Sequence, residues 1–372
     1  MKIIHVTSVH RRYDTRIFLK YSKSCYNIFN NLTLIVCDGL NNEKRNGVDI
    51  IDLGLPKNRI HRILLFPLKI FKRCLKLNAD IYHFHDPELM YVAFLLKIFG
   101  KNVVFDIHED ASSQLMDKSY INYFLKPVLK NIILFSEIIC YPFMSGLITA
   151  TPFLLNKYKK YNKNTIGIYN YLLLDELIKL PKNINLKYKK KNIFICYIGG
   201  IDKIRGIKNI IKSLSYSTSK VRLCLAGNYV DSNFRDELKK LKEWKLVDEF
   251  GVVNRKEMKN IFNKSLIGLV TFLPAKNHIN ALPNKIFEYM GGGTFVLGSD
   301  FPDWKHLIEK NNIGYCVDPT NPKMIAKKID FIIKNKKIVE KKIINANKLI
   351  KEKFNWEIQL PKLKSFYLSL VN

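Results

Sequence analysis

The sequence lacks the cysteine pairs, the long apolar runs and the acidic residues that mark several classes of protein. Its seven cysteines are scattered, odd in number and never spaced as CxxC, which excludes a disulfide-stapled secreted module and a cysteine zinc site and favours reduced thiols. No stretch reaches the ~18 unbroken apolar residues of a membrane-spanning helix. Residues 1–6 have the pattern of a strand and not of a signal peptide. We expect a cytoplasmic protein that is soluble or lies on a membrane.

Acidic residues are scarce, since 32 Asp and Glu stand against 62 Lys and Arg, a formal net charge of +30. Such a surplus attracts nucleic acid, anionic lipid or phosphorylated small molecules, although a lysine-rich composition also produces it. Residues 59–73 interleave bases with bulky apolar side chains, which suits either the headgroup layer of an anionic bilayer or a helix packed on a sheet. The absence of helix-turn-helix, RRM or zinc-finger organisation makes a nucleic-acid-binding protein the least favoured class.

Short β-branched runs alternate with helical patterns along the 372 residues. The expected strands are residues 3–9, 32–36, 48–53, 81–84, 103–107, 147–149 and 165–169, then 193–198, 221–226, 250–253, 267–272, 295–298 and 315–317. Such alternation predicts parallel sheets covered on both faces. We therefore predict an α/β protein with two Rossmann-like doubly wound domains facing each other across a cleft. They span residues 1–170 and 193–354, and a lysine-rich linker joins them at 171–192.

Ligands of doubly wound sheets bind where the strands end, so the loops after strands are the candidate sites. In the second domain, Gly199 and Gly200 let the backbone approach a ligand, and Arg205 can grip a phosphate bidentately. An ordinary tight turn is the alternative. Further along, Pro283 is expected to begin a short helix that carries Glu288 among apolar neighbours. That carboxylate needs a donor, either the hydroxyls of a ribose or a lysine.

Charged side chains also follow three strands of the first domain. They lie in the segments HRRYDTR at 10–16, HFHDPE at 83–88 and DIHED at 106–110. Asp14 or Thr15 is expected to cap the helix that follows the first segment. The density of His, Asp and Glu in the other two allows a metal site, but neither HExxH nor an i,i+4 pair is present. Hydrogen bonding to sugar hydroxyls fits these strand ends better.

Together these segments resemble glycosyltransferase family 4, the retaining, nucleotide-sugar-dependent group with the two-Rossmann GT-B fold. The resemblance covers nearly the whole chain and rests on YIGGIDKIRG at 197–206, LPNKIFEYMGGG at 282–293, GSDFP at 298–302, GYCVDP at 314–319 and FNWE at 354–357. The early DTRIF, HDPE and DIHED segments are similar to the branch that builds bacterial surface polysaccharides. The resemblance implies transfer of a sugar from a nucleoside diphosphate sugar to a hydroxyl in polysaccharide or O-antigen biosynthesis, with no metal or cofactor.

The resemblance implies a role for each matching residue of the donor site. Glu288 matches the second glutamate of the E-x7-E motif, which holds the donor ribose, and Asn280 stands at the first glutamate position. Arg205 matches a base that binds the diphosphate. The family's other diphosphate cation falls at Ile201, so Lys203 or arginines of the first domain would replace it. The implied donor-binding residues are Gly199, Gly200, Lys203, Arg205, Pro283, Asn284 and Glu288.

His108 matches the histidine that faces the donor sugar, and it joins Arg205 and Asn280 in the implied catalytic set. We expect the acceptor to be a polyprenyl-diphosphate-linked or other glycan at the inner face of the plasma membrane. The expected acceptor contacts are His10, Arg11, Arg12, Arg16, Asp86 and Glu109, and the final helix at 355–372 is expected to return to the first domain. The alternative within this fold is a nucleotide-sugar 2-epimerase, whose candidate carboxylates are Asp86, Glu88, Glu109 and Asp110.

Overall fold

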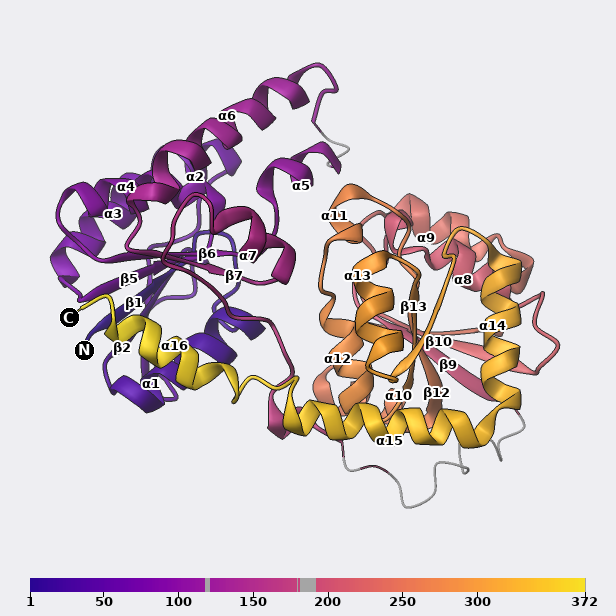
Figure 1. Ribbon diagram of the computed structural model, residues 1–372. Helices are drawn as coiled ribbons and strands as arrows, with labels where there is room; N and C mark the ends of the chain where they lie inside the picture. The colour runs from indigo at the N-terminus through magenta and orange to yellow at the C-terminus, as the bar shows by residue number, and fades with distance from the viewer. Residues whose placement is uncertain (118–120, 179, 181–191, 372) are drawn as a thin grey trace. The chain divides into compact units, whose positions relative to one another are not determined.

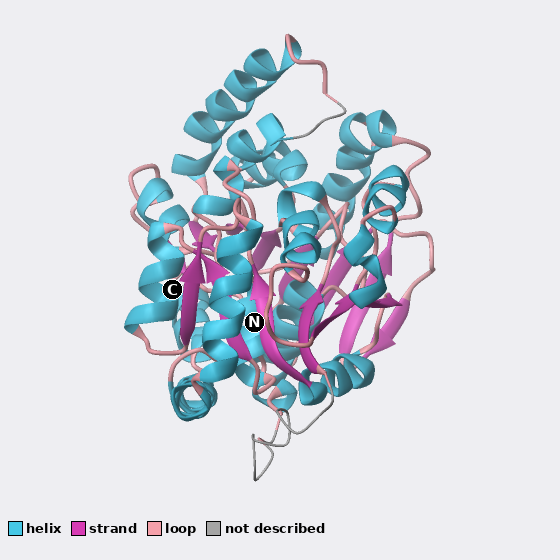
Figure 2. Cartoon of the chain, turned by 90° about the vertical axis from the view of Figure 1, so that its right-hand side faces the viewer, coloured by secondary structure: helices cyan, strands magenta, loops and turns pink. Residues whose placement is uncertain are grey.

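The computed structural model describes residues 1–117, 121–178, 180 and 192–371, so most of the expected linker and its lysine cluster lie outside the described residues. The contacts divide the chain into unit 1, Met1–Asn170 with Trp356–Asn372, and unit 2, Tyr171–Asn355 (Figure 1). Each unit is a sheet with helices packed around it (Figure 2). The predicted class, two Rossmann-like α/β domains, is confirmed.

Unit 1 contains an eight-stranded sheet in the order β3-β4-β2-β1-β5-β6-β7-β8. All its pairs are parallel except that of β3 with β4. The strands are β1 (Ile3–Val6), β2 (Leu32–Val36), β3 (Glu43–Arg45), β4 (Val48–Asp52), β5 (Ile81–Phe84), β6 (Val103–Ile107), β7 (Gly146–Thr149) and β8 (Thr165–Gly167). The sequence pattern missed β3, a three-residue edge strand of charged residues that no apolar run marks.

The helices of unit 1 cover both faces of this sheet. They are η1 (Thr15–Ser22), α1 (Lys23–Phe29), α2 (Arg59–Leu64), α3 (Phe66–Leu77), α4 (Met90–Ile98), α5 (Ala111–Asp117), α6 (Leu125–Cys140), α7 (Pro152–Tyr158) and α16 (Gln359–Leu368). Helices α3, α4 and α6 lie on one face, and α1 and α16 on the other (Figure 1). Helix α3 buries Phe66, Ile70 and Cys74 at a spacing of four, and it ends at Asn78, whose φ of 44° is left-handed.

Unit 2 contains a six-stranded parallel sheet in the order β11-β10-β9-β12-β13-β14. Its strands are β9 (Ile193–Ile198), β10 (Val221–Ala226), β11 (Val247–Gly251), β12 (Ser265–Val270), β13 (Phe295–Ser299) and β14 (Gly314–Val317). The prediction of a strand at 250–253 was wrong, because β11 (Val247–Gly251) is a half-exposed edge strand in which Asp248 and Glu249 interrupt the apolar run. Around it lie α8 (Ile207–Ser213), α9 (Ser232–Lys239), α10 (Arg255–Lys264), α11 (Lys276–Ile279), α12 (Asn284–Gly291), α13 (Pro302–Lys305), α14 (Pro322–Lys334) and α15 (Lys336–Glu352).

Both sheets reverse their direction of winding at one place, between β1 and β5 in unit 1 and between β9 and β12 in unit 2. Loops that leave neighbouring strands in opposite directions open a crevice at such a switch point, where ligands of this architecture bind. The loops after β1, β5, β9 and β12 are therefore the positions to inspect.

The seven cysteines are all buried, and none of them forms a disulfide. Burial raises the pKa of the Cys74 thiol to about 12, so this side chain packs as a small apolar group. Among the described residues, no helix is both long and apolar enough to cross a bilayer.

Candidate functional site

The loop after β9 brings two backbone segments of unit 2 into close contact. Gly199 has φ +135° and Gly227, after β10, has φ +142°. A Cβ atom on Gly227 would lie 1.8 Å from the carbonyl oxygen of Gly199, so both positions require glycine. Gly200 has open space around its Cα, and its carbonyl oxygen accepts a 2.7 Å hydrogen bond from the Tyr197 hydroxyl. Main-chain packing against Gly227 thus fixes the Gly199 loop, and the space around Gly200 stays open.

Two cations lie beside this loop. Asp202 caps the short 3-10 turn η6 (Lys203–Arg205), which delivers Arg205 to the end of β12. The Arg205 guanidinium carbon lies 4.5 Å from the centroid of the Phe272 ring. The Lys285 ammonium lies 6.0 Å from the same centroid and 5.6 Å from that of Tyr197. A Cβ atom on Gly199 would lie 2.4 Å from the Lys285 nitrogen, so the missing side chain makes room for this cation.

Neither Arg205 nor Lys285 forms a side-chain hydrogen bond or ion pair within the described part of the chain. Burial lowers the pKa of Lys285, the nearby charge of Glu288 opposes this, and the charge of Arg205 lowers the pKa further. A lysine whose pKa is lowered by burial and by a neighbouring arginine is stabilised in its charged form by an anion, so this position suits an anionic group. Sequence reasoning missed Lys285, although the spacing of three from Lys285 to Glu288 on one helix was available to it.

Helix α12 positions Glu288 at the same place. The helix begins at Asn284, so Pro283 is its N-cap and not its first residue as predicted. Glu288 lies one turn after Lys285, half-buried, and makes no side-chain hydrogen bond or ion pair with the described residues. The lysine alternative for its partner is therefore not realised there as an ion pair. Asn280 is half-buried at the C-cap of α11.

Lys203, the expected substitute for the cation missing at Ile201, lies elsewhere. Its ammonium is 3.8 Å from a carboxylate oxygen of Glu237 and 5.8 Å from the Phe234 ring centroid, both on α9. Ile201 itself is buried and pairs with the strand-like segment at Tyr229. The contacts do not support Lys203 as the second diphosphate cation, whereas Lys285 lies beside Arg205.

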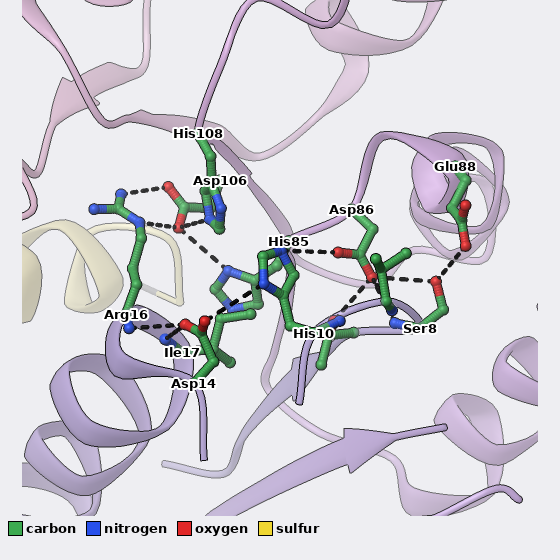
Figure 3. Close-up of polar contacts among 12 residues, drawn as sticks. Ser8, His10, Asp14, Arg16, Ile17, His85, Asp86, Glu88, Asp106 and His108 are labelled. Carbon is green, nitrogen blue, oxygen red and sulfur yellow. Dashed lines mark hydrogen bonds and ion pairs between the residues drawn. The ribbon is translucent and has the colours of Figure 1, made fainter. Parts of the chain in front are cut away.

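In unit 1, Asp86 after β5 holds the loop after β1 (Figure 3). Its Oδ2 accepts hydrogen bonds from the Thr7 hydroxyl at 2.9 Å, the Ser8 amide at 2.5 Å and the Val9 amide at 3.2 Å. The side chain is almost completely buried. Asp86 therefore organises the loop after β1. Its predicted role was contact with an acceptor, and these hydrogen bonds do not support that role.

Arg16 and Asp106 form a buried ion pair at the carboxyl end of β6 (Figure 3). Arg16 donates at 2.9 and 2.7 Å to the two carboxylate oxygens and at 3.0 Å to the Ile168 carbonyl. Burial opposes ionisation, yet the charge of Arg16 holds the pKa of Asp106 well below its usual range. These contacts give Arg16 a structural role and lend no support to its predicted contact with an acceptor, which stays a prediction.

Histidines extend this ion pair into a chain of hydrogen bonds. Asp106 Oδ2 lies 3.2 Å from His85 Nδ1 and 2.8 Å from His108 Nε2, and His85 Nε2 lies 2.9 Å from His5 Nδ1. Because Asp106 is ionised, we assign the protons to His85 Nδ1 and His5 Nδ1. His5 Nε2 is then an acceptor, buried without a partner. His108, the predicted catalytic histidine, is partly exposed and oriented by Asp106.

The remaining predicted acceptor residues differ in their exposure and in whether other side chains bind them. Arg12 is buried, and it donates at 2.8 and 2.6 Å to the two oxygens of Asp38 and at 3.0 Å to Glu43. Its predicted contact with an acceptor is therefore unsupported. Arg11 and Glu109 are exposed. His10 lies 3.5 Å from both Asp14 and Asp86; burial lowers its pKa, but the hydrogen bond to Asp14 and the charge of Asp86 outweigh this and raise it.

A pocket of about 340 Å³ lies between the loop after β1 and helix α2. Its lining includes His10, Arg11, Arg59 and Arg62, with Asp38 as the acidic member. Arg62 also donates at 2.7 Å to Glu88, which in turn accepts from Ser8. The other lining residues are Ser8, Val9, Cys37, Leu55, Pro56 and Asn58. This basic pocket suits an anionic group, and sequence reasoning missed the part that α2 has in it.

Two groups of side chains have metal-ligand chemistry among the described residues. His5 with His83 and His85, and His85 with Asp106 and His108, each bring ligand atoms within 4.8 Å of one another. The Arg16 guanidinium occupies both oxygens of Asp106, and a cation beside another cation is electrostatically unfavourable. The hydrogen-bonded arrangement accounts for the second group without a metal.

Three of the four carboxylates named for a 2-epimerase are occupied as well, and the fourth, Glu109, is exposed. Glu88 is paired with Arg62. Asp110 forms an ion pair of 2.8 Å with Lys157 and caps α5 by accepting from the Ser113 amide. With Asp86 bound to the loop after β1, these groups act as structural acceptors. An epimerase is not favoured.

Comparison with known proteins agrees with the geometry. Residues 181–349 match the family described as glycosyl transferases group 1. Sucrose-phosphate synthase from Thermosynechococcus elongatus superposes with a TM-score of 0.81 at 14% identity, over 100% of this chain and 99% of that one. The chain has the GT-B fold. The region similar to the group 1 glycosyl transferases contains Arg205, Lys285 and Glu288.

Other relatives of this GT-B chain are equally distant in sequence. A glycosyltransferase from Rickettsia africae superposes with a TM-score of 0.73 at 16% identity, over 100% and 98% of the two chains. Anabaena HepE, in complex with UDP and glucose, gives a TM-score of 0.75 at 13% identity, over 99% of both. An uncharacterised glycosyltransferase of Methanocaldococcus jannaschii is 23% identical over 218 residues, 55% of this chain and 53% of the relative. The chain thus spans about half the length of that curated relative.

Proposed function

We propose that the protein transfers a sugar from a nucleoside diphosphate sugar to a hydroxyl group, with unit 2 binding the donor. The observation that carries the proposal is the convergence of Arg205, Lys285 and Glu288 around Gly199, none of them with a hydrogen-bonded or ionic partner among the described residues. The region similar to the group 1 glycosyl transferases supports it, since it includes all three. HepE, which has the same fold, binds UDP-glucose.

The three side chains fit the parts of such a donor. A diphosphate placed against Gly199 would neutralise Arg205 and Lys285 and restore the depressed ionisation of Lys285. Glu288 would accept hydrogen bonds from the two hydroxyls of the ribose, which are donors that a carboxylate needs. The leaving diphosphate gains charge as the sugar departs. Cations fixed beside it therefore stabilise the transition state more than the ground state.

We further propose retention of the anomeric configuration. Asn280 stands where the resemblance expects a glutamate, and an amide does not act as a covalent nucleophile. Attack from the face that the diphosphate leaves is consistent with this, because a departing phosphate oxygen can accept the proton of the attacking hydroxyl. Two fixed cations take the place that a divalent metal has in other transferases, so we expect turnover to persist in EDTA.

For the acceptor we propose a glycan carried on a lipid diphosphate, used in surface-polysaccharide or O-antigen biosynthesis at the inner face of the plasma membrane. Its support is the pocket of unit 1, whose Arg11, Arg59 and Arg62 suit a phosphate group. His10 would carry a proton there, since its pKa is raised. The basic and apolar helices α2 and α3 beside the pocket suit an anionic membrane surface.

Calorimetric titration of the full chain with a panel of UDP-, GDP- and dTDP-sugars tests the donor site. We expect one nucleotide to bind, and we expect Glu288→Ala, Arg205→Ala and Lys285→Met each to weaken it about 10- to 100-fold, because each removes a charge-assisted hydrogen bond of about 1.5–3 kcal/mol. Lys203→Met is the control, a lysine of the same loop that faces α9.

Equal binding by wild type and Lys285→Met would remove Lys285 from the site, and no binding by any nucleotide of the panel would refute the proposed donor. With a productive pair of substrates, NMR of the product tests retention, because an inverted anomer is inconsistent with attack on the same face.

A further inference from the structure

Phe272, two residues after the end of β12, is the aromatic ring that the two cations of the donor site share. Its centroid lies 4.5 Å from the guanidinium carbon of Arg205 and 6.0 Å from the ammonium nitrogen of Lys285. The side chain is buried. A cation is attracted to the negative face of such a ring, and more strongly where water is excluded. Phe272 thus attracts two cations that have no ion pair among the described residues.

The ring is held in place by its neighbours. Trp304 of α13 packs against it edge-on, with the centroids 5.4 Å apart and the planes at 68°, and the His278 ring lies 4.9 Å away. The Ser299 hydroxyl, at the end of β13, donates to the Phe272 carbonyl at 2.8 Å. The Trp304 indole donates in turn to the Ala281 carbonyl at 2.8 Å. Fixed on these sides, the ring is a rigid surface for the cations.

Main-chain contacts bring Arg205 to this ring. On one side of the arginine, the Ile204 carbonyl accepts a hydrogen bond from the Leu273 amide at 2.9 Å. On the other side, a Cβ atom on Gly206 would lie 2.1 Å from the Thr271 carbonyl oxygen. The turn that carries Arg205 therefore packs directly against the residues that flank the ring.

We propose that Phe272 is a positioning residue of the donor site, which holds Arg205 and Lys285 in place before the diphosphate binds. This inference rests on the proposed function. A carboxylate at this place would also hold the arginine, but it would neutralise the charge and occupy the N–H donors that a phosphate needs. The ring attracts both cations and leaves them charged. An arginine that is already ordered loses less rotamer freedom when its anion arrives.

Fluorinated phenylalanines at position 272 separate this electrostatic role from packing. The 4-fluoro, 3,5-difluoro and 3,4,5-trifluoro forms withdraw electrons from the ring in steps and change its shape little. We expect the Kd of UDP, GDP or dTDP, whichever binds, to rise at each step, about three- to tenfold in total. Phe301 is the matched control. It is buried and packs on Trp304 at 5.1 Å and 67°, but it forms no cation–π contact with a described residue, so the same series there should leave the Kd unchanged.

NMR of the ligand-free chain measures the positioning without a donor. We expect the Nε–H group of Arg205 to have an order parameter above about 0.6, which falls through the Phe272 series. A lower value in the unmodified chain would overturn the proposal. So would equal Kd trends in the Phe272 and Phe301 series, or a Phe272 trend that Arg205→Ala leaves unchanged, because the ring would then act without the arginine.

The two measurements also separate this proposal from the donor site. A chain that binds none of the three nucleotides refutes the donor site. The effect of Phe272 on Arg205 is then decided by the order parameters alone, and values that do not fall through the fluorine series refute it.

Discussion

Unit 1 contains three neutral histidines whose burial makes its stability depend on pH. His5 and His83 are completely buried and His85 nearly so. Burial lowers the pKa of all three, and the charge that His85 would carry lowers those of His5 and His83 further. In the unfolded chain each would titrate near 6.5. Stability is therefore complete above that pH and is lost as the pH falls below it, because the unfolded state binds protons that the folded state excludes.

Each excluded proton costs about 1.4 kcal/mol per pH unit. One group acts in the opposite direction: burial raises the pKa of Glu137 to about 7, so this carboxyl holds a proton that the unfolded chain releases. Three histidines less one glutamate leave two protons, or about 2.7 kcal/mol per pH unit below 6.5. The raised pKa of His10 changes the stability of unit 1 only above pH 6.5. The lowered pKa of Asp106 changes it only at far lower pH.

Urea denaturation at pH 7.5 and 5.5 measures this loss. Fluorine NMR of protein labelled with 5-fluorotryptophan reports the units separately, since Trp356 belongs to unit 1 and Trp244 and Trp304 to unit 2. We expect unit 1 to lose about 2–3 kcal/mol between the two pH values, a large share of the 5–15 kcal/mol typical of a domain. Unit 2 has one fully buried histidine, His278, and should lose less than half as much.

The control compares how steeply the free energy of unfolding changes with pH in each variant, and not its absolute value. His5→Gln removes one excluded proton and should reduce the pH dependence of unit 1 by about half. This reduction should exceed that of the control His61→Gln, which replaces a partly exposed histidine of the same unit. The reasoning is refuted if unit 1 is equally stable at the two pH values, or if His5→Gln keeps the full slope.

Two further substitutions test packing at the proposed sites. Gly227→Ala places a methyl group 1.8 Å from the Gly199 carbonyl oxygen and should destabilise unit 2 by more than about 3 kcal/mol. The control Gly200→Ala places its methyl group in open space and should cost under about 1 kcal/mol. Similar melting curves of the two variants would contradict this. Arg16→Met should destabilise unit 1 by roughly 3–5 kcal/mol, because Asp106 loses its buried partner. An unchanged urea midpoint of the Trp356 signal would count against it.

The sequence pattern located the ends of β5, β6 and β9 correctly, and with them the loops that follow, but it extended the first strand to residue 9 whereas β1 ends at Val6. It located the correct ends because a buried parallel strand is a local run of β-branched residues bounded by polar ones. It failed at β3 and β11, edge strands whose composition is that of a loop. For α6 the spacing of the apolar residues does not by itself say which side of the helix faces solvent.

Local pattern thus determined the two doubly wound domains, the glycine loop with Arg205, and the helix that carries Glu288. Only the tertiary structure decided which charged groups form ion pairs or hydrogen bonds within the fold. Arg16 meets Asp106 across 90 positions and Asp86 meets Ser8 across 78, while Lys285 lies beside Gly199 without an ion pair to any described residue. The physical reason is that an ionisable side chain becomes structural or available according to its neighbours in space, and those neighbours are set by the order of strands in the sheet.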